Sequence, residues 1–468
     1  MQTERQQEAI SPTVAEMSKR GEEIRARWAW TEPAVWTDAM LAALENGVKG
    51  GRWYSLIDKV WKEGNLEAAW ARVRANKGVC GVDGQTVHVF EKNAPKELEH
   101  LRTLLQRGTY APTAVMRTYI LKPGSREKRP LGIPVVRDRV VQTATRQVME
   151  PIFEQGFAEH SYGFRPGRGC RDALRVVNAA LKEGRRWVVD ADLKSYFDMI
   201  PHEKLMALVE RRIADTKVLD LIRKYLKQGV MDGMKEWTPD EGTPQGSSIS
   251  PLLANIYLDP LDHLMAVKGM LMVRYADDFI VLCRTQEDAQ AALEVIKAWV
   301  AEAQLTLHPD KTRIVHEAEG FDFLGYTFRE GMCFPRKKSL NKFKDKVREY
   351  TRRANGKSME EIVVKLNASL RGWYGYFKHS YRTTFSGLDK WVRHRLRAIL
   401  LKRQGKSRWR FTHEDHKTWP NAYFYDLGLF SLAKAHESEC RSRKRNSQLE
   451  SRMREIRQSG SEGGVAFA

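Results

Sequence analysis

Two adjacent aspartates between two apolar runs constrain this chain more than any other feature. Mostly apolar segments at residues 271–276 and 279–282 flank Asp277 and Asp278, a pattern typical of a strand, a tight turn and a second strand. Turns favour aspartate, so one interpretation is a solvated turn with two charges. Adjacent carboxylates repel each other, however, and no basic residue follows them directly. Because hard cations prefer oxygen ligands and would offset this repulsion, the pattern favours a divalent metal site.

Length and composition limit the class of protein. A chain of 468 residues is too long for one core and should form two or three domains. The hydrophobic content of 42% excludes a disordered chain, and the net charge of +20 favours a polyanionic partner. Five scattered cysteines without a CxxC pair indicate reduced thiols in a cytoplasmic protein. The polar N-terminus and the lack of a long apolar run predict no membrane partner.

A second carboxylate strand precedes the hairpin in the sequence. Residues 187–193 have the composition of a strand, and their alternation places Asp190 and Asp192 on one face. From the residues alone, a metal site could use either carboxylate.

Basic residues are concentrated in a predicted hairpin at residues 116–134. Its residues at the turn and on the returning strand include Lys122, Lys128 and Arg129. An exposed basic loop and a clamp on a triphosphate are equally consistent with this segment. The glycine-rich basic turn at 161–169 would allow the backbone to approach phosphates closely.

Apolar spacing predicts the other elements. Residues 1–50 are expected to form short helices in a loose lead-in. Helices are predicted at 55–76, 138–157, 252–264 and 288–303, and further strands at 305–312 and 321–328. Three helices follow Arg336, the second opened by a capping box at 358–361 and the third beginning at Ser386. Residues 336–410 hold 23 Lys and Arg against 5 acids, which favours a nucleic-acid surface over an ordinary solvated face.

Seven blocks in this order resemble the reverse transcriptase encoded within group II introns, also called an intron maturase. The blocks are NKGVCGVDG at 76–84, RPLGIP at 129–134, HSYGFRPGRG at 160–169, ADLKSYFD at 191–198, GTPQG at 242–246, RYADD at 274–278 and FDFLGYTF at 321–328. RYADD contains the YxDD signature of reverse transcriptases, and residues 408–432 resemble the maturase region called domain X. The resemblance runs from about residue 66 to about residue 435.

The resemblance implies an α+β fold of the right-hand polymerase type, with an antiparallel palm sheet. After a lead-in at 1–50, fingers and palm are expected at 51–335 and a helical thumb at 336–405. The remainder of domain X is expected at 406–440, and a basic, disordered tail at 441–468.

The resemblance also implies the site residues by position. Asp192, Asp277 and Asp278 should be catalytic and should hold two Mg²⁺ ions roughly 4 Å apart, for attack of a 3′-hydroxyl on an α-phosphate. Asp192 is preferred to Asp190 because it stands five residues before Phe197, as in the family pattern. The residues expected to contact the incoming nucleotide are Phe197 as a steric gate against the ribose 2′-hydroxyl, Gln245 beside the nucleotide, and Lys122 and Arg129 on the triphosphate.

The implied function is RNA-directed DNA synthesis that copies the intron for mobility, together with assistance to splicing. Its partners would be group II intron RNA, target DNA, an RNA–DNA primer-template and dNTPs. A reverse transcriptase from a retron or a CRISPR locus is one alternative, but such enzymes lack the segment at 408–432. A splicing factor whose palm only binds RNA is another, against which the three intact aspartates argue.

A DNA endonuclease of the His-Asn-His type, present in many relatives, is not expected in this chain. Only about 30 residues follow the maturase-like block, too few to bury a domain core, and they contain one cysteine, Cys440. Any mobility would then use a 3′ end made elsewhere.

Overall fold

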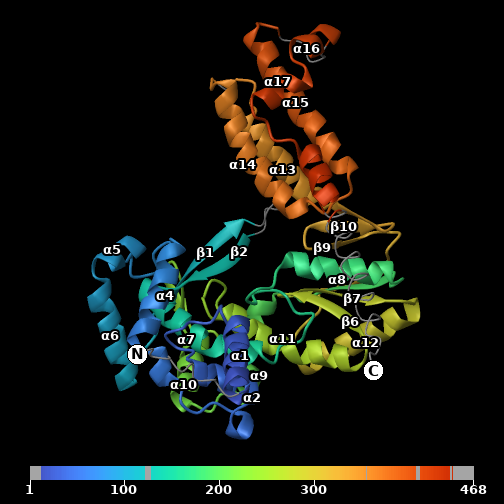
Figure 1. The fold of residues 1–468 in the computed structure, drawn as a ribbon. Helices are drawn as coiled ribbons and strands as arrows, with labels where there is room; N and C mark the ends of the chain where they lie inside the picture. Colours follow the sequence, from blue (N-terminus) through green and yellow to red (C-terminus); the bar gives the residue numbers. More distant parts are fainter. Residues whose placement is uncertain (1–11, 122–127, 355, 407–411, 443–444, 446–468) are drawn as a thin grey trace, which may run out of the picture. The chain divides into compact units, whose positions relative to one another are not determined.

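The computed structural model describes residues 12–121, 128–354, 356–406, 412–442 and 445, and Figure 1 shows their helices and strands. The chain forms two compact units, Met1–His316 and Glu317–Ala468. Among the residues so described, no helix is long and apolar enough to cross a membrane.

The first unit contains two four-stranded sheets and most of the helices. Its helices are α1 (Pro12–Arg27), α2 (Asp38–Asn46), α3 (Ile57–Val60), α4 (Glu63–Ala75), α5 (Val87–Lys92), α6 (Ala94–Arg107), α7 (Val136–Glu154), α8 (Cys170–Lys182), α9 (His202–Glu210), α10 (Thr216–Leu226), α11 (Ser250–Val267) and α12 (Gln286–Glu302), with short 3-10 turns η1 (Lys49–Gly51) and η2 (Tyr196–Asp198). Its strands are β1 (Val115–Leu121), β2 (Lys128–Ile133), β3 (Trp187–Asp192), β4 (Val230–Asp232), β5 (Lys235–Trp237), β6 (Leu271–Tyr275), β7 (Asp278–Cys283) and β8 (Arg313–His316).

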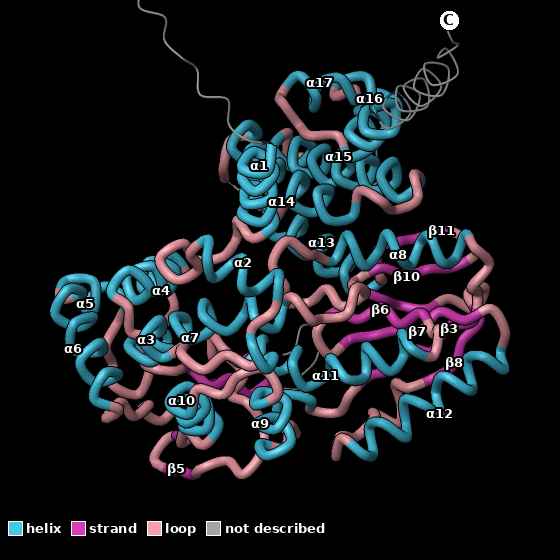
Figure 2. Tube along the Cα trace, turned by 60° about the horizontal axis from the view of Figure 1, so that its bottom comes forward, coloured by secondary structure: helices cyan, strands magenta, loops and turns pink. Residues whose placement is uncertain are grey.

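The sheet that carries the carboxylates has the order β6-β7-β3-β8, and all its neighbours are antiparallel. Val189, Ala191, Phe279 and Val281 share one face of this sheet and belong to the large hydrophobic core. Helices α11 and α12 cover that face, and α8 covers the opposite one (Figures 1 and 2). The antiparallel palm sheet expected from the sequence is therefore confirmed.

The second sheet has the order β2-β1-β4-β5 and contains the basic hairpin. Strands β1 and β2 pair antiparallel from Met116 opposite Ile133 to Leu121 opposite Lys128, as the sequence predicts. The helix that follows, α7, is buried along most of its length and occupies the middle of the unit's core.

Three expectations about single elements are wrong. The helix expected at 55–76 is two helices, because the Asn65 side chain donates to the carbonyls of Lys59 and Val60 and ends α3 there. The region 305–312 is not a strand: Leu307 forms one bridge and a turn follows, so the strand begins at Arg313. The described part of the lead-in, residues 12–50, is not loose, since Trp28, Trp36 and Leu44 are buried in the core.

The second unit combines a small sheet with helices. Its strands are β9 (Phe321–Phe323), β10 (Tyr326–Arg329) and β11 (Met332–Pro335), in the order β11-β10-β9. Its helices are α13 (Lys337–Tyr350), α14 (Met359–Phe377), α15 (Thr383–Arg403), α16 (His413–Thr418) and α17 (Asn421–Asp426).

The boundaries in the second unit refine the expectations. The strand predicted at 321–328 is split by a left-handed turn at Leu324 and Gly325, with φ angles of 47° and 80°. The predicted capping box of α14 is confirmed, because the Ser358 hydroxyl accepts from the Glu361 amide and the Glu361 carboxylate accepts from the Ser358 amide. The third helix begins at Thr383 rather than at Ser386.

One hydrophobic core runs through the described helices of the second unit. Phe343 and Leu366 from the predicted thumb share it with Trp419, Phe424 and Leu429 from the segment that resembles domain X. Each part therefore covers apolar surface of the other.

Candidate active site

The hairpin of β6 and β7 closes with the two-residue turn Ala276-Asp277, because Tyr275 pairs directly with Asp278. Ala276 has a φ of 60°, in the left-handed region that alanine rarely adopts. Asp277 is half-buried on the turn, and Asp278 is the exposed first residue of β7. The strand, tight turn and strand predicted from the sequence are confirmed.

The pairing register separates the two aspartates of β3. Asp192 is the last residue of that strand and lies directly opposite Asp278. Residues opposite each other in an antiparallel pair project from the same face with their Cβ atoms close together. Asp190 lies further from the turn, opposite Ile280, with its carboxylate 3.6 Å from the Arg313 guanidinium. The structure thus brings Asp192 beside the hairpin aspartates and leaves Asp190 beside an arginine.

Several carboxylates lie close together at this edge of the sheet, and they repel one another unless a positive charge lies near them. Burial raises the pKa of Asp277, the nearby Asp192 raises it further, and the charges of Arg129 and Arg274 oppose the rise. Lys311 offsets part of the charge, since its Nζ lies 2.6 Å from an Asp192 oxygen.

The donor chemistry of this edge fits a hard divalent cation, because it offers carboxylate oxygens in a region of like charge. Within the described ranges, no three His, Cys, Asp or Glu side chains already converge in a ligating arrangement. Strand register and the turn place Asp192, Asp277 and Asp278 next to one another in the backbone. To bind one ion together, their side chains would have to move closer to each other.

Phe197 lies on η2, which follows β3 after three intervening residues, 193–195. Ser195, with a φ of 47°, turns the chain there. The Phe197 ring is half-buried and packs edge-on against Tyr196 and Phe164, with centroid distances of 5.5 Å and 6.5 Å. Its position is thus fixed by packing while part of the ring remains accessible.

Gln245 is held by contacts at both ends. Its side-chain nitrogen donates to an Asp198 oxygen at 3.1 Å, and its backbone carbonyl accepts from the Gly132 amide at 2.6 Å. The next residue must be glycine, because Gly246 has a φ of 116° and a Cβ there would overlap the Gly132 carbonyl. A cleft of ≈ 590 Å³ opens beside Gln245 and Asp198.

Arg129 on β2 is a residue of the basic hairpin whose charge acts on the carboxylates. It is exposed, and its charge lowers the pKa values of both Asp277 and Asp198, although burial keeps both above the ordinary value. The other basic residue expected to contact the triphosphate, Lys122, lies outside the described residues.

Three residues at this site were given no role from the sequence. Asp198 supports Gln245, Lys311 pairs with Asp192, and Arg274 lies beneath the turn. Asp198 and Arg274 belong to the blocks ADLKSYFD and RYADD, so the sequence could have indicated that they lie near the site. Lys311 lies in a turn whose place in the fold depends on the bridge between Leu193 and Leu307.

An antiparallel sheet with aspartates at the end of one strand and on the neighbouring hairpin defines the palm of a polymerase. Comparison with known proteins specifies the class. Residues 120–328 match the family "Reverse transcriptase (RNA-dependent DNA polymerase)", and residues 340–417 match "Group II intron, maturase-specific domain".

Individual proteins are also similar to this chain, and one of them is named for a group II intron. "Protein YkfC" of Escherichia coli (strain K12) is 36% identical over 285 residues, which cover 53% of this chain and 74% of that protein. "Group II intron-encoded protein LtrA" of Lactococcus lactis subsp. cremoris is 31% identical over 328 residues, which cover 56% of this chain and 54% of LtrA. "Uncharacterized 91 kDa protein in cob intron" of Schizosaccharomyces pombe is 44% identical over 204 residues, covering 42% of this chain and 24% of that protein.

The chain belongs to the family of reverse transcriptases and maturases encoded by group II introns. It spans about half the length of LtrA. The match to the maturase-specific domain favours this family over the retron and CRISPR-associated alternatives.

Proposed function

We propose that this protein is an RNA-directed DNA polymerase whose Asp192, Asp277 and Asp278 are the ligands of two Mg²⁺ ions. One observation supports the assignment most strongly: Asp192 and Asp278 are register partners at the ends of adjacent strands, and Asp277 occupies the turn beside them. Bound there, Mg²⁺ would stabilise the charge that develops on the phosphoryl group being transferred.

The protein's own residues would bind and select the nucleotide. Arg129, together with Lys122 on the basis of the sequence, would offset the charge of the triphosphate. Gln245, oriented by Asp198, would lie beside the incoming nucleotide. The Phe197 ring, held by its aromatic neighbours, would exclude a ribose 2′-hydroxyl by its volume.

The second unit would bind group II intron RNA and thereby assist its splicing, and the same complex would act on target DNA and an RNA–DNA primer-template. Cationic side chains on α13, such as Lys337, Lys338 and Lys342, are exposed and could contact phosphates. Arg393 and Arg397 on α15 are buried and so are not part of that exposed surface.

Extension of a DNA primer on an RNA template tests the enzymatic part of the proposal. We expect cDNA in the presence of dNTPs and Mg²⁺, and none after chelation of the metal. Folded protein that makes no cDNA under these conditions would contradict the polymerase assignment. Binding to intron RNA is measured separately, so that the polymerase and maturase parts can succeed or fail independently.

A further inference from the structure

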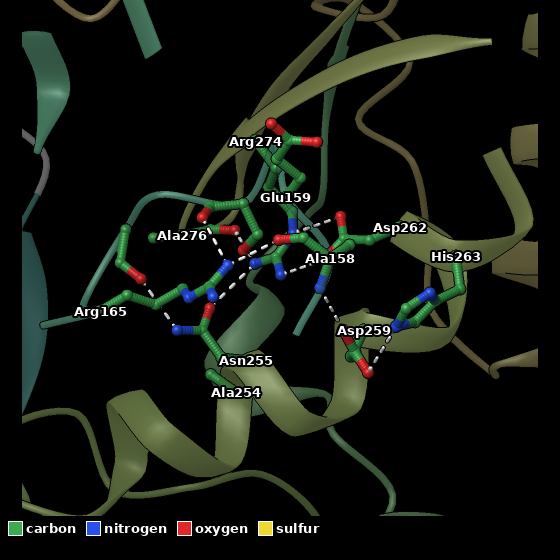
Figure 3. Close-up of polar contacts among 12 residues, drawn as sticks. Ala158, Glu159, Arg165, Ala254, Asn255, Asp259, Asp262, His263, Arg274 and Ala276 are labelled. Carbon is green, nitrogen blue, oxygen red and sulfur yellow. Dashed lines mark hydrogen bonds and ion pairs between the residues drawn. The ribbon is translucent and has the colours of Figure 1, made fainter. Parts of the chain in front are cut away.

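Arg274 is a fully buried arginine directly beneath the turn that carries Asp277. Its exposed fraction is 0%, and it lies on β6 two residues before Ala276. Because it pairs with Phe279, its side chain projects from the sheet face that packs on α11, opposite to the face of Asp278. Figure 3 shows its guanidinium among Asn255, Asp262 and Ala276.

Every group of this guanidinium has a partner. Nε donates to the two Asp262 oxygens at 2.8 Å and 3.0 Å, and Nη2 also pairs with that carboxylate. Nη1 donates to the Asn255 side-chain oxygen and to the Ala276 carbonyl, both at 2.9 Å. Asn255 and Asp262 are seven residues apart on α11 and therefore face the same side of that helix. The fork thus joins the helix to the turn.

The acceptor on the turn is a residue under backbone strain. Ala276 has its φ at 60°, in the left-handed region, and a non-glycine residue keeps this conformation only where its surroundings hold it there. A buried donor that bonds the carbonyl of this residue favours the strained conformation over a relaxed one.

A second contact holds the turn from the side. Gly163 packs so closely on Ala276 that a Cβ at position 163 would overlap the Ala276 nitrogen. Asn255 donates to the Gly163 carbonyl at 2.8 Å, and the Tyr162 amide donates to the Arg274 carbonyl at 2.9 Å. The same asparagine therefore fixes both the guanidinium and the loop that confines the turn.

Stability alone does not account for this arrangement. A buried ion pair seldom stabilises a fold more than apolar residues of the same volume would. Nε and Nη2 of the guanidinium are sufficient to neutralise Asp262. The third nitrogen, Nη1, bonds instead to the backbone of the turn.

We propose that Arg274 is a positioning residue for DNA synthesis, which fixes the turn presenting Asp277 and Asp278 through its bond to the Ala276 carbonyl. This inference rests on the proposed polymerase function. It assigns the Arg of RYADD a role that depends on the planar fork and not only on the positive charge.

The variant Arg274→Lys separates these two properties. Lysine keeps a charge opposite Asp262, but its single nitrogen cannot also reach Asn255 and Ala276 in the same geometry. We expect kcat for primer extension to fall on the order of 100-fold, as for other small displacements of reacting groups, with the KM for dNTP little changed. We also expect faster amide hydrogen exchange in residues 275–279 of the protein alone.

Arg397→Lys is the matched control. Arg397 is also buried and also donates to a backbone carbonyl and an asparagine oxygen, those of Trp419 and Asn421, at 2.9 Å each. We expect it to keep the wild-type kcat and the wild-type exchange of residues 275–279. If Arg274→Lys does not fold, Asn255→Ala tests the same network without changing a charge, with a smaller loss in kcat and faster exchange in the turn.

The outcomes distinguish the inference from its premise. A wild-type kcat in folded Arg274→Lys, or equal losses in Arg274→Lys and Arg397→Lys, would overturn the positioning role. If the wild-type protein itself makes no cDNA, the polymerase assignment fails, while the exchange measurement still tests whether Arg274 holds the turn.

Discussion

At the scale of single residues, Asp190 and Asp192 have the same chemistry, the same strand and the same face, yet different surroundings. Asp192 ends β3 opposite Asp278, and Asp190 lies opposite Ile280 with Arg313 nearby. Strand alternation cannot separate them, because the difference arises from where β7 begins relative to the end of β3.

This pair of aspartates offers a matched test of the carboxylate site. Asp192→Asn should lower kcat for primer extension by at least ~100-fold, because the amide lacks the negative charge that would bind the metal ion. Asp190→Asn removes an equal charge two residues away and should keep most of the activity. Steady-state kinetics on both proteins decides this, and equal effects of the two substitutions would argue against a special role for Asp192.

Phe197 makes a second residue-scale prediction. Truncation to alanine removes a ring whose partners, Tyr196 and Phe164, remain to support the chain. We expect Phe197→Ala to relax discrimination against ribonucleotides roughly 10- to 100-fold, the range typical of steric selection in a pocket. The measurement is the ratio of kcat/KM for a dNTP and its rNTP, and an unchanged ratio would remove Phe197 from the gate role.

At the scale of elements, hydrophobic spacing was sufficient where an element is long and periodic. It located α7, α11 and α12 to within three residues at each end. The spacing of Ser358 and Glu361 separately identified the capping box of α14. Hydrophobic spacing failed where one tertiary contact decides. The hydrogen bonds from the Asn65 side chain to carbonyls of α3 divide a continuous helical pattern into two helices. Leu307 forms a single β-bridge, and the turn that follows prevents a longer strand.

The basic helices of the second unit make an element-scale prediction. Replacing the exposed Lys337, Lys338 and Lys342 of α13 by glutamine should weaken binding to structured RNA and flatten the dependence of log K on log salt concentration. Each lost phosphate contact should reduce the slope by about one unit, because fewer counterions are released from the RNA on binding. Titrations at several salt concentrations measure this slope.

A control for this experiment removes the same charge elsewhere. Lys182, Lys268 and Lys297 are exposed lysines of the first unit, on or directly after other helices. Their triple substitution by glutamine should leave the slope near that of the wild type. If both triple variants have the wild-type slope, the lysines of α13 face solvent and not RNA.

At the scale of the whole molecule, ordered blocks predicted the family, the antiparallel palm and the place of its carboxylates. They could not predict Lys311 beside Asp192 or the network of Arg274, which joins residues from a loop, a helix and a strand far apart in the sequence. Such contacts depend on the packing of complete elements, which no local pattern encodes.

The most direct test of the account compares primer extension by the wild-type protein and Asp277→Asn on one RNA template. Burial raises the pKa of Asp277, so a neutral amide there should not impair folding, and melting temperature and RNA binding should stay unchanged. We predict cDNA from the wild-type protein in Mg²⁺ and none from folded, RNA-binding Asp277→Asn. Extension by Asp277→Asn at the wild-type rate in the same Mg²⁺ concentration would contradict the central claim.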